Sequence, residues 1–180
     1  ERIVKVVENV PTVFDTSLLK PFIEILPPNL PERQKRIIVD HLRASTFLLA
    51  DGVLPSNKDA GYILRRLLRR ALVCEHLNNL SPQTFESIII EVIKNYGIFY
   101  PELERKDEII NSYWVEREKF AKTLEKGVKE VYKFSEINAS TAFNLYETFG
   151  ISLDIIKDLA PDKISKLTDK AFEEEFKKHQ

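Results

Sequence analysis

The sequence predicts an all-α fold, and three observations favour it. Apolar residues recur at spacings of three and four residues along most of the chain, which is the period of one helix face. Prolines, 9 in the 180 residues, fall mostly between these stretches rather than within them. Strand-like patterns are confined to two short segments, 12–14 and 151–156.

The expected helices end near proline, glycine or a polar capping residue. They cover residues 1–9, 17–26, 31–50, 57–79, 81–97, 101–134, 142–149 and 169–180. Gly52 is placed as a C-terminal cap, and Ser56 with Asp59 resembles a capping box at the start of the next helix. Asn138 to Thr141 can cap the helix that Gly150 closes. The architecture is therefore a helical bundle built around the helix–loop–helix at 31–50 and 57–79, with one long helix at 101–134.

Four of these helices have a clear apolar side, among them 57–79 and 101–134. In 57–79 it comprises Ile63, Leu64, Leu67, Leu68, Ala71 and Leu72. In 101–134 it comprises Ile110, Trp114, Phe120, Leu124, Val128 and Val131.

Basic residues concentrate in the helix–loop–helix. Residues 33–73 hold nine Lys and Arg against three Asp, a local charge of +6, whereas the whole chain carries −1. Arg65 with Arg69 and Arg66 with Arg70 stand four residues apart, where like charges on a helix repel. Nearby carboxylates or bound phosphates must therefore compensate for the cluster.

Both explanations stay open from the residues alone. The arginines could form a solvated face with acidic neighbours, or they could bind phosphates bidentately as a nucleic-acid surface. Asn57 suits a helix cap, but an amide in a loop can also recognise a base because it both donates and accepts. Glu147 is an ordinary surface carboxylate unless it accepts hydrogen bonds from an exocyclic amine.

Other chemistries find little support. Cys74 is the only cysteine, so neither an internal disulfide nor a cysteine metal cluster is possible. His41 falls on an apolar helix side and is expected in the core, and His76 and His179 have no zinc-type spacing. There is no phosphate-binding glycine loop, nucleophile motif, signal peptide or membrane-spanning apolar run. With no methionine, and with a helical pattern at its first residue, the chain is expected to be a piece of a longer protein.

Two blocks of sequence resemble the alanyl-tRNA synthetases, a family of class II aminoacyl-tRNA synthetases. Residues 36–71, RIIVDHLRASTFLLADGVLPSNKDAGYILRRLLRRA, follow that family's long ungapped pattern R-x-I-A-D-H…D-G-V-x-P-S-N-x-x-x-G-Y-x-L-R-R-x-x-R-R-A. Residues 141–155, TAFNLYETFGISLDI, are similar to T-A-F-x-L-Y-D-T-Y-G-F-P-x-D-L, with Glu147 in place of the family's Asp. At the start of the chain, residues 1–3 resemble the end of the last class II motif, whose arginine binds ATP.

The resemblance implies a division of the chain. Residues 1–30 would end the aminoacylation domain, 31–160 would form the helical tRNA-recognition domain, and 161–180 would lead toward an editing domain. It implies attachment of alanine in an ATP-dependent reaction by the whole enzyme, with this fragment inactive alone. Arg2 would be a remnant of the ATP site, and no cofactor is expected in the fragment itself. Zinc would belong to the absent editing domain.

The resemblance also implies the partner and the residues that contact it. The partner would be the acceptor stem of tRNA-Ala, with its G:U wobble pair recognised by Asn57 and Glu147. Its backbone would be held by seven basic residues: Arg36, Arg43, Lys58, Arg65, Arg66, Arg69 and Arg70. A cytoplasmic location is expected, with no membrane or DNA partner. The alternative is a helical protein–protein interaction module without RNA specificity, whose arginines pair with internal carboxylates.

Overall fold

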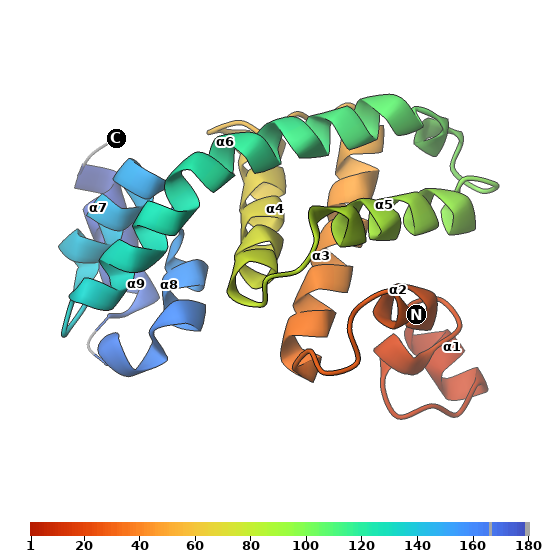
Figure 1. Cartoon of the computed structure of the whole chain (residues 1–180), viewed down its shortest axis with the longest axis horizontal. Coiled ribbons are helices and arrows are strands. Elements are labelled where there is room, and N and C mark those ends of the chain that lie inside the picture. Colours follow the sequence, from red (N-terminus) through yellow and green to blue (C-terminus); the bar gives the residue numbers. More distant parts are fainter. Residues whose placement is uncertain (166, 179–180) are drawn as a thin grey trace. The chain divides into compact units, whose positions relative to one another are not determined.

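The computed structural model describes residues 1–165 and 167–178, and the all-α prediction is confirmed (Figure 1). Within that part of the chain there are nine α-helices, three short 3-10 helices and no strand. The α-helices are α1 (Arg2–Val7), α2 (Lys20–Glu24), α3 (Glu32–Ala50), α4 (Asp59–Leu77), α5 (Pro82–Tyr96), α6 (Lys106–Lys133), α7 (Ala139–Phe149), α8 (Leu153–Leu159) and α9 (Asp169–Lys178). The 3-10 helices are η1 (Val13–Asp15), η2 (Pro101–Glu104) and η3 (Pro161–Lys163).

The chain forms two compact units. The first comprises Glu1–Glu116, and the second begins at Arg117. The boundary falls inside α6, so residues 106–116 of this helix belong to the first unit and residues 117–133 to the second. This division is structural, and the functional division after residues 30 and 160 stays a prediction.

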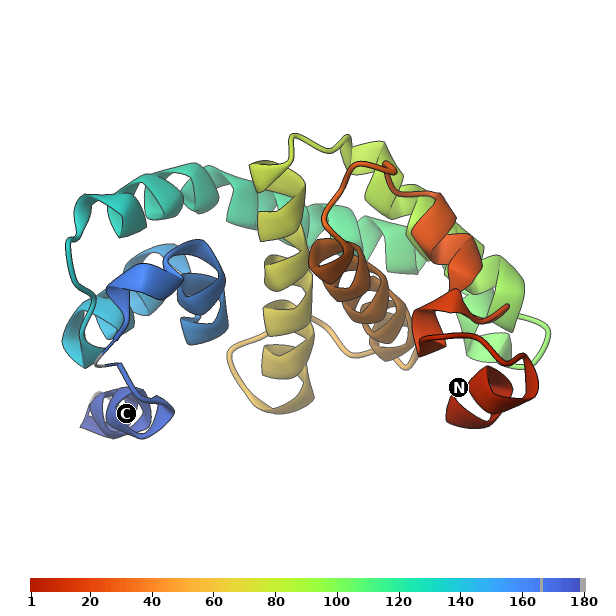
Figure 2. The same cartoon turned by 90° about the horizontal axis from the view of Figure 1, so that it is seen from below.

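The core of the first unit lies where α3 packs against α4 and α5. Ile38 and Leu42 of α3, together with Leu64 and Leu68 of α4, are at most 1% exposed. Each pair is four residues apart, so each helix presents one apolar side to the other. Figure 2 shows α4 with the loop that joins it to α3.

Gly52 ends α3 as predicted. Its φ of +82° lies in the left-handed region that glycine adopts without strain. The Gly52 amide donates to the Leu49 carbonyl over 3.0 Å, and the Val53 amide donates to the Leu48 carbonyl over 3.0 Å. These bonds satisfy carbonyls that have no partner within the helix.

The second unit has its own core on α6, α7 and α8. Phe120, Val131, Leu145 and Ile155 are at most 2% exposed. Asn138 caps α7 by accepting a hydrogen bond from the Thr141 amide, as predicted. Gly150 closes α7 with a φ of +70°, also as predicted.

The aromatic residues of α9 pack on α7. Phe176 lies 6.0 Å from Phe143 and 5.5 Å from Tyr146, measured between ring centroids. Phe172 lies 6.3 Å from Tyr146. The polar tail helix therefore contributes its two phenylalanines to an aromatic cluster.

Several local predictions were wrong. Both strand segments are helical: residues 13–15 form η1, and residues 153–159 form α8. The helix expected at 17–26 is only the short α2. The long helix begins at Lys106 rather than 101, because Arg105 has a ψ of +44° that interrupts the helix after η2.

The apolar sides were partly misplaced. At the start of α6 the buried residues are Ile109 and Tyr113 rather than Ile110 and Trp114. The predicted apolar side was therefore displaced by one residue there. Ile63 is 48% exposed and does not belong to the core side of α4. Local periodicity does not determine which side faces the neighbours when two adjacent residues are both apolar.

Candidate nucleic-acid interface

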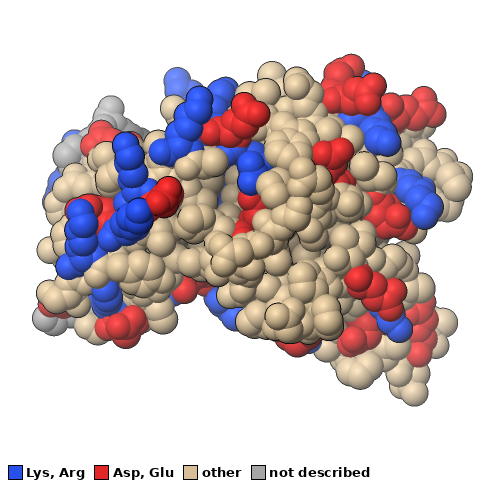
Figure 3. Space-filling view, viewed as in Figure 1, with Lys and Arg blue, Asp and Glu red and all other residues tan. Residues whose placement is uncertain are grey.

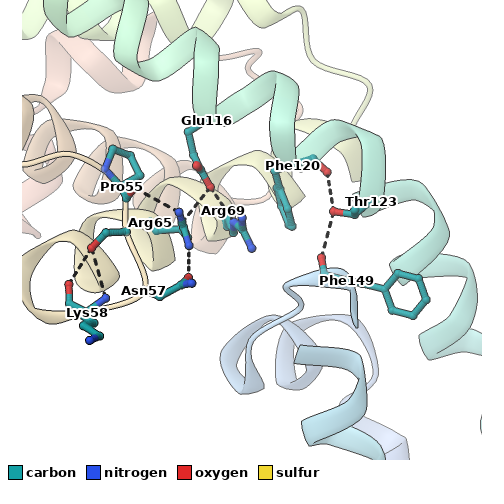
Figure 4. A network of polar contacts seen from close by, with 10 residues as sticks. Pro55, Asn57, Lys58, Arg65, Arg69, Glu116, Phe120, Thr123 and Phe149 are labelled. Carbon is teal, nitrogen blue, oxygen red and sulfur yellow. Dashed lines mark hydrogen bonds and ion pairs between the residues drawn. The ribbon is translucent and has the colours of Figure 1, made fainter. Parts of the chain in front are cut away.

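Asn57 lies exposed in the loop between α3 and α4, and Arg65 holds its side chain. The Arg65 guanidinium donates to the Asn57 Oδ1 atom and to the Pro55 carbonyl, the latter over 3.2 Å (Figure 4). Arg65, in the second turn of α4, therefore restrains both the backbone of the loop and its predicted recognition residue.

The predicted capping box at Ser56 and Asp59 is wrong. Lys58 occupies the N-cap position of α4, with no hydrogen bond from a side-chain cap. The Ser56 hydroxyl instead accepts from the Lys58 amide and donates to the Lys58 carbonyl. Asp59 has a φ of +49°, so the chain turns sharply between the loop and the helix. Lys58 itself is exposed at this turn.

The loop approaches α4 closely because residue 61 is glycine. A Cβ atom on Gly61 would lie 2.2 Å from the Ser56 hydroxyl oxygen and 2.4 Å from the Leu54 carbonyl oxygen. Real Cβ atoms do not come so near a backbone oxygen, so any larger residue would displace the loop. Gly61 thus fixes the position from which Asn57 projects.

Glu116 compensates for part of the arginine cluster. Its Oε1 atom lies 2.8 Å from Arg69 Nε and 3.5 Å from Arg65 Nε. The Glu116 side chain is only 3% exposed, and those of Arg65 and Arg69 are 23% and 19% exposed. Sequence reasoning missed Glu116, because a partner 47 residues from Arg69 leaves no signal in local spacing.

The other predicted basic residues lie in different surroundings. Arg43 forms an ion pair with Glu1 over 2.5 Å. Arg36 is half-buried, with its guanidinium 5.4 Å from the centroid of the Phe14 ring. Arg66 is exposed and Arg70 is half-buried. The predicted ATP-site remnant, Arg2, is exposed at the first residue of α1.

Glu147 is exposed on α7 and belongs to the second unit. Asn57 and all seven predicted backbone-binding residues belong to the first unit. The structure therefore brings Asn57 and Arg65 into contact, and it leaves the joint role of Asn57 and Glu147 as a prediction.

A second basic feature, also missed from the sequence, lies on the part of α6 in the second unit. We call it the lysine stripe: five exposed lysines at spacings of three and four residues, Lys119, Lys122, Lys126, Lys129 and Lys133. At 100° per residue they share one side of the helix, opposite the buried side. Basic side chains gather over this region at the left of Figure 3. The spacing could have been found in the sequence, but alternation with glutamates disguises it.

Only two lysines of the stripe have an acidic partner among the described residues. Lys129 pairs with Glu125 over 2.6 Å, and Lys133 pairs with Glu130 over 2.7 Å. In the same described part of the chain, no carboxylate lies within ion-pair distance of Lys119, Lys122 or Lys126.

His41 and His76, the two histidines that the structure describes, form no catalytic arrangement. His41 is half-buried, with Nδ1 3.4 Å from the Asp40 carboxylate, and this contact lowers the pKa of Asp40. His76 is exposed, and His179 lies outside the described residues.

Within residues 1–165 and 167–178 no group of three or more His, Cys, Asp and Glu side chains could hold a metal ion. In the same ranges, each helix is too short or too polar to cross a membrane.

The chain belongs to the class II (A) tRNA synthetases, whose family model matches residues 1–180. Its relatives include alanine–tRNA ligases. That of Fervidobacterium nodosum is 37% identical over 187 residues, which cover 96% of this chain and 22% of the relative. Those of Mycoplasmoides gallisepticum and Francisella philomiragia are each 36% identical, over 100% and 99% of this chain and 22% of their own length. The chain thus spans about 22% of the length of the relatives that it matches.

Proposed function

We propose that this chain is the tRNA-binding helical region of an alanine–tRNA ligase. It would bind the acceptor stem of tRNA-Ala and recognise the G:U wobble pair. The observation that carries the proposal is the similarity to alanine–tRNA ligases over essentially the whole chain. The exposed Asn57, in a loop fixed from α4, supports a role in base recognition.

The chemistry of an RNA duplex suits the proposed recognition residues. A-form RNA presents its base edges and 2′-hydroxyls in a wide, shallow minor groove. In a G:U pair the guanine amino group lacks the acceptor that cytosine would provide, so the Glu147 carboxylate can accept from it. The amide of Asn57 would meet a neighbouring group on the same stem.

Phosphate contacts would come from exposed cations rather than from the whole arginine cluster. Lys58, Arg66 and the lysine stripe expose their charges, and such contacts position an RNA without specifying its sequence. Arg36, Arg43, Arg69 and Arg70 are less exposed, so we expect smaller backbone contributions from them.

The catalytic activity belongs to the whole ligase in this proposal. ATP-dependent attachment of alanine would need the part of the enzyme outside this chain, so the isolated chain would be inactive. Arg2 would contribute to the ATP site only in that context. We place the enzyme in the cytoplasm, where tRNA is charged.

The test is binding of the full chain to two acceptor-stem minihelices that differ only in a G:U or a G:C pair. We expect tighter binding to the G:U minihelix, and Asn57→Ala should lower this discrimination by about 1–3 kcal/mol. Asn111→Ala, which removes an exposed amide from α6 within the same unit, is the matched control and should leave discrimination unchanged. Equal affinity of the unaltered chain for both minihelices would contradict specific recognition.

The alternative is a protein-interaction module, which the internal pairing of Arg65 and Arg69 with Glu116 favours. It predicts that the chain binds neither minihelix in a salt-sensitive manner. A protein that neutralises phosphates instead loses affinity steeply as salt rises. A titration of minihelix binding against salt therefore separates the two functions.

A further inference from the structure

The Arg65 side chain connects the loop to the interior of the first unit. Its guanidinium contacts three acceptors from three segments: the Asn57 side chain, the Pro55 carbonyl and the Glu116 carboxylate (Figure 4). The two Nη atoms donate to Asn57 and Pro55, whereas the Nε atom lies 3.5 Å from Glu116 Oε1 as an ion pair without a hydrogen bond. The planar guanidinium directs its N–H groups along several fixed directions, so it can face all three acceptors at once. An ammonium group on a flexible stem has no such geometry.

The contact with Arg65 determines which way the Asn57 amide points. A guanidinium can only donate, so the Asn57 atom that faces it must be the acceptor Oδ1. The Nδ2 amino group then points away from Arg65. In the part of the chain that the structure describes, no acceptor is within hydrogen-bond distance of this amino group. Asn57 is exposed, so its two N–H donors are available to a partner.

Glu116 restrains the Arg65 side chain by charge. Its side chain is 3% exposed, and it forms ion pairs with Arg69 as well as Arg65. A desolvated carboxylate is costly to leave without its cationic partners, which favours the observed position of Arg65. The Pro55 contact extends the same restraint to the loop backbone, over 3.2 Å.

We propose that Arg65 is a positioning residue, held by Glu116, that fixes Asn57 as a hydrogen-bond donor. The group on the RNA that Asn57 contacts is then an acceptor: a base carbonyl, a ring nitrogen or a ribose oxygen. This assignment rests on the proposed function and replaces the role of phosphate contact predicted for Arg65. It makes Asn57 and Glu147 opposite in character, one donating and the other accepting.

Two substitutions test the proposal by minihelix binding. Asn57→Asp keeps the size of the side chain and its contact with Arg65 but removes the donor. We expect it to lose about as much G:U discrimination as Asn57→Ala, at least fivefold. Arg65→Lys keeps the charge, so a phosphate contact would survive it, whereas the triple contact would not. We expect Arg65→Lys to lower discrimination at least fivefold with the salt dependence unchanged.

Arg66→Ala is the matched control, because Arg66 is the exposed neighbour on the same helix. It should reduce the slope of log affinity against log salt by about one and leave discrimination intact. Full discrimination by Asn57→Asp or by Arg65→Lys would overturn the proposal. Asn57 lies in an exposed loop, so its substitution tests the donor role even if an Arg65 variant folds poorly.

A measurement without RNA distinguishes failure of this proposal from failure of the proposed function. The NMR signals of the Asn57 side-chain NH2 group can be assigned by their loss in Asn57→Asp. Their order parameter should be high in the unaltered chain and fall in Arg65→Lys, with the backbone spectrum otherwise preserved. An equally mobile amide in both proteins would overturn the positioning role, whatever the RNA result. A rigid amide in a chain that binds both minihelices equally would leave the positioning role intact and contradict the proposed function instead.

Discussion

The arginines of α4 and the lysine stripe of α6 are both basic helix faces, yet their surroundings differ. Arg65 and Arg69 are about four-fifths buried and share the carboxylate of Glu116. The lysines of the stripe are all exposed, and the two acidic partners found for them among the described residues, Glu125 and Glu130, lie on the same helix. The arginines belong to the first unit and the lysine stripe to the second.

The density of basic residues in a sequence therefore does not measure the charge exposed on the surface. Arginine tolerates partial burial because its planar group is weakly hydrated and can satisfy several acceptors. Lysine carries a strongly hydrated point charge that stays in water. Two arginines of the most basic segment, α4, therefore form internal contacts with Glu116. The lysine stripe lies in a segment of alternating charge, yet all its lysines are exposed.

The largest effect that we expect to distinguish the two faces is on stability. Glu116→Ala leaves Arg65 and Arg69 without the carboxylate that holds both, and it should lower the free energy of unfolding by about 3 kcal/mol. Urea denaturation of the full chain measures this difference.

Glu118→Ala provides the control, because Glu118 is an exposed carboxylate two residues further along the same helix. It should change the free energy of unfolding by less than about 0.5 kcal/mol. If both variants lost the same stability, Glu116 would not be a special partner of the arginines and the comparison would fail.

Much of the fold, but little of this contrast, could be predicted from the sequence. Gly52, Asn138 and Gly150 were placed correctly, because caps depend on backbone geometry that only certain residues satisfy. The register at the start of α6 could not be predicted, since Ile109 and Ile110 are equally apolar and tertiary packing chooses between them. The capping box failed because the Ser56 hydroxyl bonds to the backbone of Lys58, which itself occupies the N-cap position.

The candidate site, like the fold, could be predicted from the sequence only in part. The exposure of Asn57 and the position of its loop follow from the local sequence, where turn residues separate two helices. The contact between Arg65 and Glu116 joins residues 51 positions apart, so no local pattern contains it. Which arginines face inward is therefore decided by packing.

The second prediction concerns RNA binding by the lysine stripe. Lys119, Lys122 and Lys126, changed together to Gln, should reduce the slope of log affinity against log salt by up to about three, because each phosphate contact contributes about one. Discrimination between the G:U and G:C minihelices should not change, since phosphate contacts carry no sequence information. Fluorescence anisotropy at several salt concentrations measures both quantities.

The control for the stripe is the same number of exposed lysines from the first unit. Lys20, Lys94 and Lys106, changed together to Gln, alter the net charge by the same amount. A smaller loss of slope from this control would show that position matters beyond total charge. Equal losses from both triple variants would mean that the stripe is merely a solvated helix face.

The smallest effect is a difference in size within the stripe itself. Lys129 pairs with Glu125 four residues before it, the favourable orientation on a helix, so Lys129→Gln should cost about 0.2–0.5 kcal/mol of stability. Lys122 has like charges at Lys119 and Lys126 but opposite charges at Glu118 and Glu125, all three or four residues away, so Lys122→Gln should leave stability nearly unchanged. Thermal unfolding at low salt should show a loss for Lys129→Gln and almost none for Lys122→Gln. At about 1 M salt, where charges are screened beyond about 3 Å, the loss from Lys129→Gln should shrink, while the loss from Glu116→Ala should largely persist because that carboxylate is buried. A loss from Glu116→Ala that vanished in high salt would place the arginine cluster in the same solvated class as the lysines.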